Sequence, residues 1–502
     1  MNVVVLDFIQ DDGYITFRYA DNLVNHGRLY YNSDTRGPYG YSNPLYVFIL
    51  AAFRVLVLKQ ISFEAISRVI ASLSLGAIFF ILLKAVSTES RKNKTGALFL
   101  LTIVFLASTI VVFPYLLPNF FSGLETALFT FLVLVLMSFL FASPFNEKWF
   151  LLCLGVALTL RIDSVLLLMP IVIVYILDSS RSPIRKHVRN ILIVYAIVAS
   201  FFLLQFILTG ALIPLSFGHK SQIFSPSTFL RYSRFSTIAL LPLAVILVRR
   251  STNCFRYILF AIFYALYISL FYSFFMHWHF QRYVFPFVFS IFSVSLMLLF
   301  KTWKQSDWTS IAILSVYMLF TFIPGTLQGF SWVSGYRVAM LYPKHMANAF
   351  LQAQIDDKLK TFGSYDAGYI AYRTGWRIID LQGLTTPEVT HQDIGQVLSE
   401  RNPTVLIVST GKHVEPSAIR LFSQYQENPA AIPSNYFFVK HFPLTNKYWW
   451  PWSQYSYYVF VNENANPTLI NELRSISLDV EKEIAYQKHI FRLLELLSFL
   501  RF

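Results

Sequence analysis

Long apolar segments are the feature that most constrains this chain. About 20 apolar residues are needed to span the hydrocarbon core of a bilayer. Apolar runs of this length, or nearly so, recur between residues 66 and 324. They lie at about 66–86, 97–113, 124–142, 149–160, 165–178, 191–209, 236–248, 258–275, 284–300 and 309–324. Since 55% of the 502 residues are hydrophobic and only 14% are charged, we predict a polytopic α-helical membrane protein rather than a soluble globular one, with about ten or eleven spans.

The basic residues between these runs predict the orientation. The formal charge of +14 arises from Lys and Arg in short loops, which is typical of cytoplasmic loops and argues against a nucleic-acid partner. All these loops share one side if residues 149–178 form a hairpin of two short helices that turns at Arg161-Ile162-Asp163. A single long helix there would put every later basic loop on the opposite side. We therefore predict the hairpin.

The opposite, outer side then collects loops rich in Pro, Gly, Tyr, Trp and His. The first, 9–65, has the pattern of a surface helix at 12–27 and of an interfacial or re-entrant helix at 43–58. An outer first loop should follow a crossing helix, and the segment MNVVVLDF is too short to be one. Either the N-terminus is truncated or misassigned, or the aspartates reach the outer side without such a helix. We favour a preceding transmembrane helix that is missing from this sequence.

The composition changes after about residue 325. Short β-rich runs at 403–410, 435–442 and 456–462 alternate with helix-like stretches at about 345–360, 385–400 and 414–426. This alternation predicts an α/β domain at 325–502 outside the membrane, which ends in an amphipathic helix with Leu469, Leu473, Ile476 and Val480 at helical spacing. The predicted parts are thus the first loop at 1–65, a helical membrane module at 66–324, and this domain.

Two adjacent carboxylates, Asp11 and Asp12, open the first polar loop. A carboxylate beside a membrane is a candidate general base for an acceptor hydroxyl. Cations and histidines of the other outer loops could hold an anionic leaving group: Arg161, Lys220, Arg282, His219, His277 and His279. The alternative is that these charged residues cap helices and pair across loops.

Other outer residues have two interpretations as well. Glu125 begins a span, where the helix dipole alone favours a carboxylate. The aromatic residues at 277–285 and 447–452 could stack on sugar rings or anchor the chain at the interface. Asp366 and Asp380 fit turn and cap positions. Cys153 and Cys254 lie in no metal-binding pattern, and the two histidines of HWH do not by themselves form a metal site, so none is predicted.

Six segments resemble one family in order along the chain. They are DDGYITFRYADNLVNHGRLYYN with GYSNPLY (11–46), SGLETALF (122–129), LTLRIDSVLLL (158–168), GALIPLSFGHKS (210–221), HFQRYVFP (279–286) and DAGYIAYRTGWRIIDLQGLTTPEV (366–389). The chain resembles the GT-C class of polytopic glycosyltransferases, in particular the bacterial branch that contains mycobacterial terminal arabinofuranosyltransferases. It departs from the family where Arg161-Ile162-Asp163 replaces the usual Arg-Pro turn.

The resemblance implies a multi-pass enzyme of the bacterial inner membrane, with its C-terminal domain on the extracytoplasmic side. Such enzymes pass a sugar from a polyprenyl-phosphate carrier to a cell-envelope glycan or lipid-linked acceptor. Asp11 would act as the base, with Asp12 assisting. The donor phosphate would bind Arg18, Arg161, Lys220, His219 and Arg282, and the substrates would contact Tyr14, Tyr19, Glu125, His279 and Tyr283. No organic cofactor is implied, and a requirement for a divalent cation stays open.

Two rival functions remain at this stage. A transporter or flippase of lipid-linked sugars predicts repeated halves and ionisable residues at mid-membrane, and the sequence shows no repeat. A non-catalytic scaffold that binds glycan or protein would make Asp11 and Asp12 dispensable. The sugar stays open too, because a hexose or deoxyhexose is as compatible as the arabinofuranose that the resemblance implies.

Overall fold

The computed structural model describes residues 9–32, 37–56, 60–90, 119–141, 145–178, 182–216, 226–230, 233, 252–275, 281–301, 336, 339–411, 414–421, 429–443 and 456–477. Contacts divide the chain into two compact units. The helical unit combines residues 42–207 and 220–325, and the sheet unit combines residues 1–41, 208–219 and 326–502. The predicted first loop is therefore shared between the units, and the three-part division stays an expectation.

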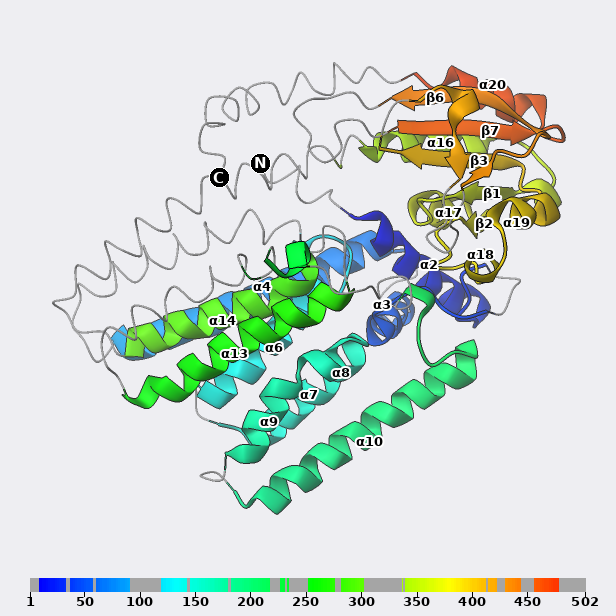
Figure 1. The fold of residues 1–502 in the computed structure, drawn as a ribbon. Coiled ribbons are helices and arrows are strands. Elements are labelled where there is room, and N and C mark those ends of the chain that lie inside the picture. Colours follow the sequence, from blue (N-terminus) through cyan, green and yellow to red (C-terminus); the bar gives the residue numbers. More distant parts are fainter. Residues whose placement is uncertain are drawn as a thin grey trace, which may run out of the picture. The chain divides into compact units, whose positions relative to one another are not determined.

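The helical unit follows the predicted apolar runs wherever it is described. Its helices are α3 (Pro44–Leu56), α4 (Phe63–Ser90), α6 (Thr126–Phe141), α7 (Glu147–Leu160), α8 (Ser164–Leu167), α9 (Met169–Leu177), α10 (Ile184–Thr209), α13 (Thr252–Phe275) and α14 (Gln281–Lys301) (Figure 1). Among the described residues, three segments are long and apolar enough to cross a membrane: Phe63–Lys84, Ile184–Thr209 and Phe255–Phe274. The predicted runs at 97–113, 236–248 and 309–324 lie outside the described residues, so the number of spans stays a prediction.

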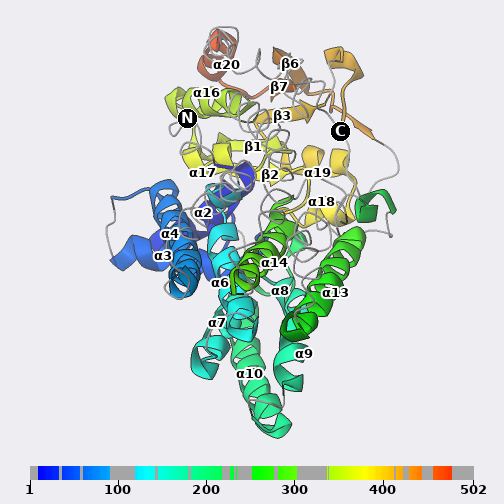
Figure 2. The same ribbon diagram turned by 90° about the vertical axis from the view of Figure 1, so that its left-hand side faces the viewer.

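The predicted hairpin at 149–178 is present. The chain leaves the helix after Leu160 and resumes it at Ser164, as expected for a turn at 161–163. The Tyr175 ring stacks on Phe150 with 4.8 Å between centroids, and the Tyr175 hydroxyl donates to Glu147 Oε1 at 2.8 Å. Because the end of α9 thus contacts the start of α7, the two helices run in opposite directions (Figure 2).

Basic residues gather at the end of this hairpin opposite its turn. Lys186 Nζ at the start of α10 lies 2.7 Å from Glu147 Oε2 at the start of α7. The neighbouring Lys148, Arg185 and Arg189 are exposed. The turn at 161–163 therefore lies at the other end of α7, as the predicted sidedness requires.

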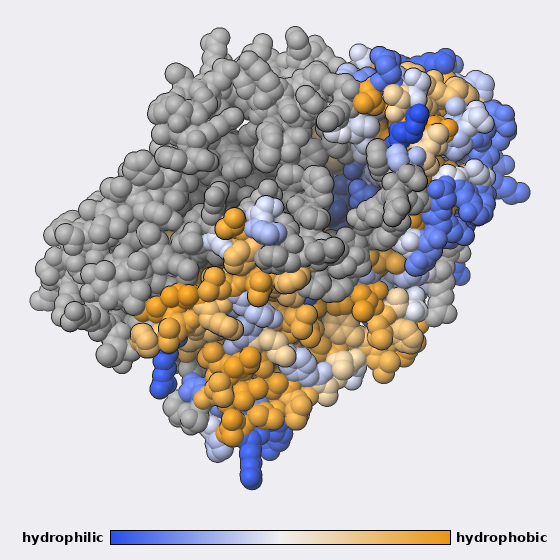
Figure 3. Space-filling view, viewed as in Figure 1, coloured by the Kyte–Doolittle hydropathy of each residue, from blue (hydrophilic) through white to orange (hydrophobic). Residues whose placement is uncertain are grey.

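The exposed surface of α10 and α13 is apolar (Figure 3). On α10, Leu192 and Ile197 are each 64% exposed, and Phe263 on α13 is 58% exposed. A monomeric soluble protein rarely exposes large apolar patches, whereas in a bilayer such side chains contact lipid. The surface of these helices fits the predicted membrane environment.

The sheet unit contains a five-stranded mixed sheet in the order β2-β1-β3-β7-β6. Its strands are β1 (Thr361–Ser364), β2 (Arg377–Asp380), β3 (Val405–Thr410), β6 (Tyr436–Pro443) and β7 (Ser456–Asn462). β1 pairs in parallel with β2 and β3, and β7 is antiparallel to β3 and β6. The three β-rich runs are strands as predicted, whereas β1 and β2 were not predicted.

The helices of this unit are α2 (Asp11–His26), α16 (Leu341–Gln352), α17 (Tyr369–Thr374), α18 (Glu388–His391), α19 (Ile394–Arg401) and α20 (Pro467–Ser475). The prediction of a helix at 414–426 is wrong for the described part of this segment. That part forms the 3-10 turn η2 (Pro416–Ala418) and the strand β4 (Arg420–Leu421), which pairs with β5 (Ala430–Ala431). The turn η2 is capped by Ile419, whose backbone is extended (φ -65°, ψ 134°), so the apolar residues here do not continue as an α-helix.

The predicted C-terminal amphipathic helix docks on this unit as α20. Leu469 and Leu473 are fully buried, and Lys440 of β6 donates to the Ile476 carbonyl oxygen at 2.6 Å. The helix ends at Ser475, so Ile476, which was expected within it, lies just past its end. Val480 and the rest of the predicted helix lie outside the described residues.

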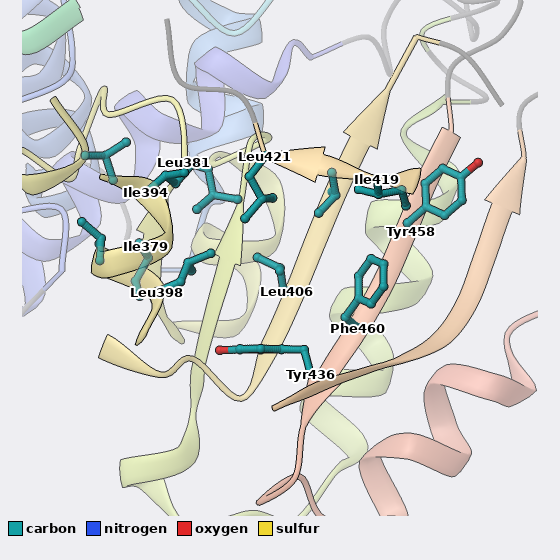
Figure 4. Close-up of a cluster of buried hydrophobic side chains, with 13 residues drawn as sticks. Ile379, Leu381, Ile394, Leu398, Leu406, Ile419, Leu421, Tyr436, Tyr458 and Phe460 are labelled. Carbon is teal, nitrogen blue, oxygen red and sulfur yellow. The ribbon is translucent and has the colours of Figure 1, made fainter. Parts of the chain in front are cut away.

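The core on one face of the sheet is a cluster of buried residues (Figure 4). Leu406 lies in its middle, on β3, and is fully buried. We expect Leu406→Ala to lower the free energy of unfolding by about 2–5 kcal/mol, because it removes buried methyl groups and leaves a cavity. Thermal unfolding of the purified protein measures this. Leu351→Ala, at a 52% exposed site on α16, is the matched control, and an equal effect of both substitutions would contradict the described core.

Candidate active site

The twin acids lie in the first turn of α2, which begins at Asp11. Negative side chains are favoured there by the helix dipole. Gly27 ends the helix with φ 63°, a left-handed conformation that glycine adopts without strain. The sequence predicted this helix at 12–27, and the structure confirms it within a residue at each end.

The Asp11 carboxylate is held by two backbone N–H groups. Gly368 N donates to Oδ2 at 2.7 Å, and Tyr369 N donates to Oδ1 at 2.8 Å. The Asp11 N–H donates in turn to the Tyr336 hydroxyl. A carboxylate has about four lone-pair positions, so two of them stay available on Asp11 after these bonds.

The surroundings of Asp11 favour its neutral form. Burial raises the pKa of Asp11 to about 8, the negative charge of Asp366 adds to the rise, and Asp12 adds less. The N–H groups of Tyr369 and Gly368 act in the opposite direction, because they stabilise the charged form. A carboxyl group with a pKa near the working pH is suited to proton transfer.

Asp366 is thus a member of the site that the sequence did not predict. It was expected to be a turn residue, and its N–H does donate to the Ser364 hydroxyl at 3.1 Å. Its charge nevertheless acts on Asp11. Within the described part of the chain, no group of three or more His, Cys, Asp or Glu residues has an arrangement that could hold a metal ion.

Two tyrosines of α2, Tyr14 and Tyr19, pack within the sheet unit. The Tyr14 ring packs edge-on against Tyr369, with centroids 4.9 Å apart, and lies 5.6 Å from the Tyr372 ring. Tyr19 is 1% exposed, and its hydroxyl accepts a bond from the Gly40 N–H at 3.0 Å. Both of these predicted substrate contacts are therefore also packing residues of the sheet unit, and their contact with substrate stays a prediction.

Arg18 is buried and binds backbone carbonyl oxygens. Its Nε donates to the Tyr31 carbonyl oxygen at 2.7 Å, and its two terminal nitrogens donate to the carbonyl oxygens of Ala371 and Trp376. A buried guanidinium needs such acceptors. The bonds to Ala371 and Trp376 join α2 to the chain around α17. The expected contact with donor phosphate is untested, and this geometry gives us no reason to assign it.

Asp380 is a turn residue, as expected. Its carboxylate accepts bonds from the backbone N–H groups of Gln382 and Thr385, both at 2.9 Å. Burial raises the pKa of Asp380 to about 6, and these bonds oppose the rise. Its lone pairs serve the turn rather than a substrate.

In the helical unit, Arg161 lies between two carboxylates. Its Nε and Nη2 donate to Asp163 Oδ1 and Oδ2 at 3.0 and 2.6 Å, and its Nη1 lies 3.4 Å from Glu125 Oε1. Arg161 is only 2% exposed. The sequence alternative of pairing across loops therefore describes Arg161 and Glu125 well.

Aromatic residues complete this cluster. The Arg161 guanidinium carbon lies 4.6 Å from the centroid of the Tyr283 ring. The Tyr283 hydroxyl accepts a bond from Arg282 Nη2 at 3.1 Å, and the Tyr272 hydroxyl donates to Asp163 at 3.2 Å. Four predicted site residues from three separate loops thus meet in one network: Glu125, Arg161, Arg282 and Tyr283.

Asn43 ties the start of α3 to the same network. Its Nδ2 donates to Glu125 Oε2 at 2.7 Å, and the neighbouring Ser42 carbonyl oxygen accepts from the Ile162 N–H at 3.2 Å. The segment around residue 43, the start of α6 and the turn at 161–163 therefore lie at one end of the helical unit, which agrees with their predicted common side.

The fold of this chain is similar to that of a known glycosyltransferase. ArnT from Cupriavidus metallidurans, in its apo crystal structure, superposes with a TM-score of 0.55 over 93% of this chain and 97% of that chain, at 12% identity. ArnT belongs to the GT-C class. This chain has the GT-C fold. At this identity the likeness extends to the fold alone.

Residues 334–460 match a domain of unknown function (DUF8728), which covers most of the described sheet and its helices. A search of curated proteins finds no match.

Three of the predicted site residues, His219, Lys220 and His279, lie outside the described residues, as does His277. For the described ones, the structure gathers Asp11, Asp12, Tyr14, Arg18 and Tyr19 in the sheet unit, and the other four in the helical unit.

Proposed function

We propose that this protein is an integral-membrane glycosyltransferase that moves a sugar from a polyprenyl-phosphate carrier to a cell-envelope glycan or lipid-linked acceptor. The observation that carries the proposal is Asp11, a carboxylate of raised pKa fixed at the start of α2 in a chain of GT-C fold. ArnT, an undecaprenyl-phosphate-aminoarabinose transferase, catalyses a reaction of the same class.

The reaction needs one base and one stabilised leaving group. The acceptor hydroxyl oxygen attacks the anomeric carbon, and the Asp11 carboxylate takes the hydroxyl proton. The bond between that carbon and the phosphate oxygen breaks, and its electron pair leaves with polyprenyl phosphate. Because the attack comes from the face opposite the leaving group, the anomeric configuration is inverted.

Several parts of this proposal come from the sequence. Arg282, Lys220 and His219 are the proposed ligands of the donor phosphate, and Tyr14, Tyr19, Tyr283 and His279 the proposed substrate contacts. We assign Arg161 and Glu125 to holding the turn at 161–163, because each already has a charged partner. We also propose that the protein has about ten or eleven membrane spans and that its C-terminal domain lies on the extracytoplasmic side.

The pH dependence of transfer follows from the pKa of Asp11. A general base acts only when deprotonated, so kcat/KM should rise with pH and level off above a pKa of about 8. An unburied aspartate would already be ionised at pH 5. A pH–rate profile of the purified enzyme between pH 5.5 and 9.5 measures this rise, the ascending limb of the profile. A kcat/KM that is flat across this range would contradict the role of Asp11 as general base.

A transfer assay tests the function itself. The purified protein is given radiolabelled polyprenyl-phosphate-linked arabinofuranose or glucose, together with extracted envelope glycan. We expect label in the glycan and release of polyprenyl phosphate, and no transfer from the matching nucleotide sugars. A transporter would instead move the intact lipid-linked sugar across a vesicle membrane, and a scaffold would bind glycan without turnover.

A further inference from the structure

The backbone at Gly368 and Tyr369 approaches Asp11 more closely than any side chain at position 368 would allow. A Cβ atom built on Gly368 would lie 2.0 Å from the Asp11 carbonyl oxygen and 2.8 Å from its Cγ. Real Cβ atoms essentially never come within 3.0 Å of such an atom, so one of the two segments would have to move. Gly368 is therefore required by this close approach and not by a special backbone angle.

The approach brings two donors to one carboxylate. With N···O distances of 2.7 and 2.8 Å, the N–H groups of Gly368 and Tyr369 each bind a different Asp11 oxygen. Two such bonds fix the position and the rotation of the carboxylate plane. The edge-on packing of Tyr14 against Tyr369 adds a second contact between the same segments.

We propose that the domain at 326–502 positions the catalytic base, with Gly368 as the positioning residue whose missing side chain admits Asp11 to its two backbone donors. This inference rests on the proposed function of Asp11. It gives the matched domain at 334–460 a part in catalysis. Asp11 can then be active only when this domain is folded against α2.

Activity of Gly368→Ala is the first test. We expect kcat at pH 7 to fall about 10²-fold, because the base is displaced, with little change in the KM for the donor. The ascending limb of the pH–rate profile should also move to higher pH, since the lost N–H bonds lower the pKa of Asp11. Gly411→Ala is the matched control, because a Cβ there meets nothing within 4 Å. A fall in kcat with an unmoved limb, or no fall, would overturn the proposal.

Amide hydrogen exchange is the second test, and it needs no activity. In Asp11→Ala, the peptide that contains residues 366–372 should exchange faster than in the wild type, because the acceptors of two N–H groups are gone. Asp21→Ala, on the same helix, should leave that peptide unchanged. Equal exchange in Asp11→Ala and wild type would overturn the positioning contact. If wild type and Gly411→Ala both lack transfer, the proposed function fails, while exchange still decides whether the contact exists.

Discussion

Replacement of Asp11 by asparagine is expected to lower kcat for sugar transfer by about 10²–10⁴-fold, the usual contribution of a general base. Asparagine keeps the size of the side chain and one acceptor oxygen, so at least one backbone bond from Gly368 or Tyr369 can persist. It has no group that takes a proton from a hydroxyl at neutral pH. The assay is transfer from polyprenyl-phosphate-linked sugar, with thermal unfolding of the same preparation.

Asp21→Asn is the matched control, because Asp21 lies on the same helix, outside the proposed site. It should retain transfer. Asp12→Asn should lower the rate less than Asp11→Asn, because the charge of Asp12 contributes little to the pKa of Asp11. Wild-type rates in a folded Asp11→Asn protein would remove Asp11 from the mechanism.

Loss of Arg161 should have the largest effect on stability. Arg161→Ala leaves the buried Glu125 and the partly buried Asp163 without their cation, and removing one partner of a buried ion pair costs about 3–5 kcal/mol. Arg161→Lys should recover only part of this loss, because an ammonium group cannot bind the two Asp163 oxygens as a planar fork does. Thermal unfolding in detergent measures the difference.

The control for this experiment is Arg185→Ala, at an exposed arginine on α10, which should change stability by no more than about 0.5 kcal/mol. Transfer kinetics separate the two interpretations of Arg161. A stable Arg161→Ala protein with a greatly raised KM for the lipid-linked donor would favour phosphate binding over the structural part assigned here.

Much of the helical unit could be predicted, because lipid imposes a simple rule on sequence. An apolar run of sufficient length must form a helix in a bilayer, since its backbone finds no other hydrogen-bond partners there. The break at Arg161-Ile162-Asp163 also followed from charge, because basic loops had to share one side. The strands β1 and β2 were missed since each has four residues, too few for a clear alternation of apolar and polar side chains.

The candidate site could be predicted only in part. Asp11 and Asp12 could be predicted because they are neighbouring charges next to apolar spans, and this pattern is local in the sequence. Gly368, Asp366 and Tyr336 lie more than 300 residues away, and no local pattern connects them with α2. The position of Arg18 was equally hidden, because its acceptors are backbone carbonyls, which every residue has.

The proposed reaction requires Asp11 on the outer side of the membrane, and labelling of single cysteines tests this sidedness most directly. With Cys153 and Cys254 replaced by serine, a cysteine is placed at Asn25, Glu463 or Arg185, which are exposed positions on α2, in the C-terminal domain and at the basic end of α10. We predict that an impermeant thiol reagent applied from outside modifies the first two in sealed cells, and the third only after permeabilisation. Modification of Asn25→Cys only after permeabilisation would place α2 in the cytoplasm, and Asp11 could not then serve a reaction at the outer face.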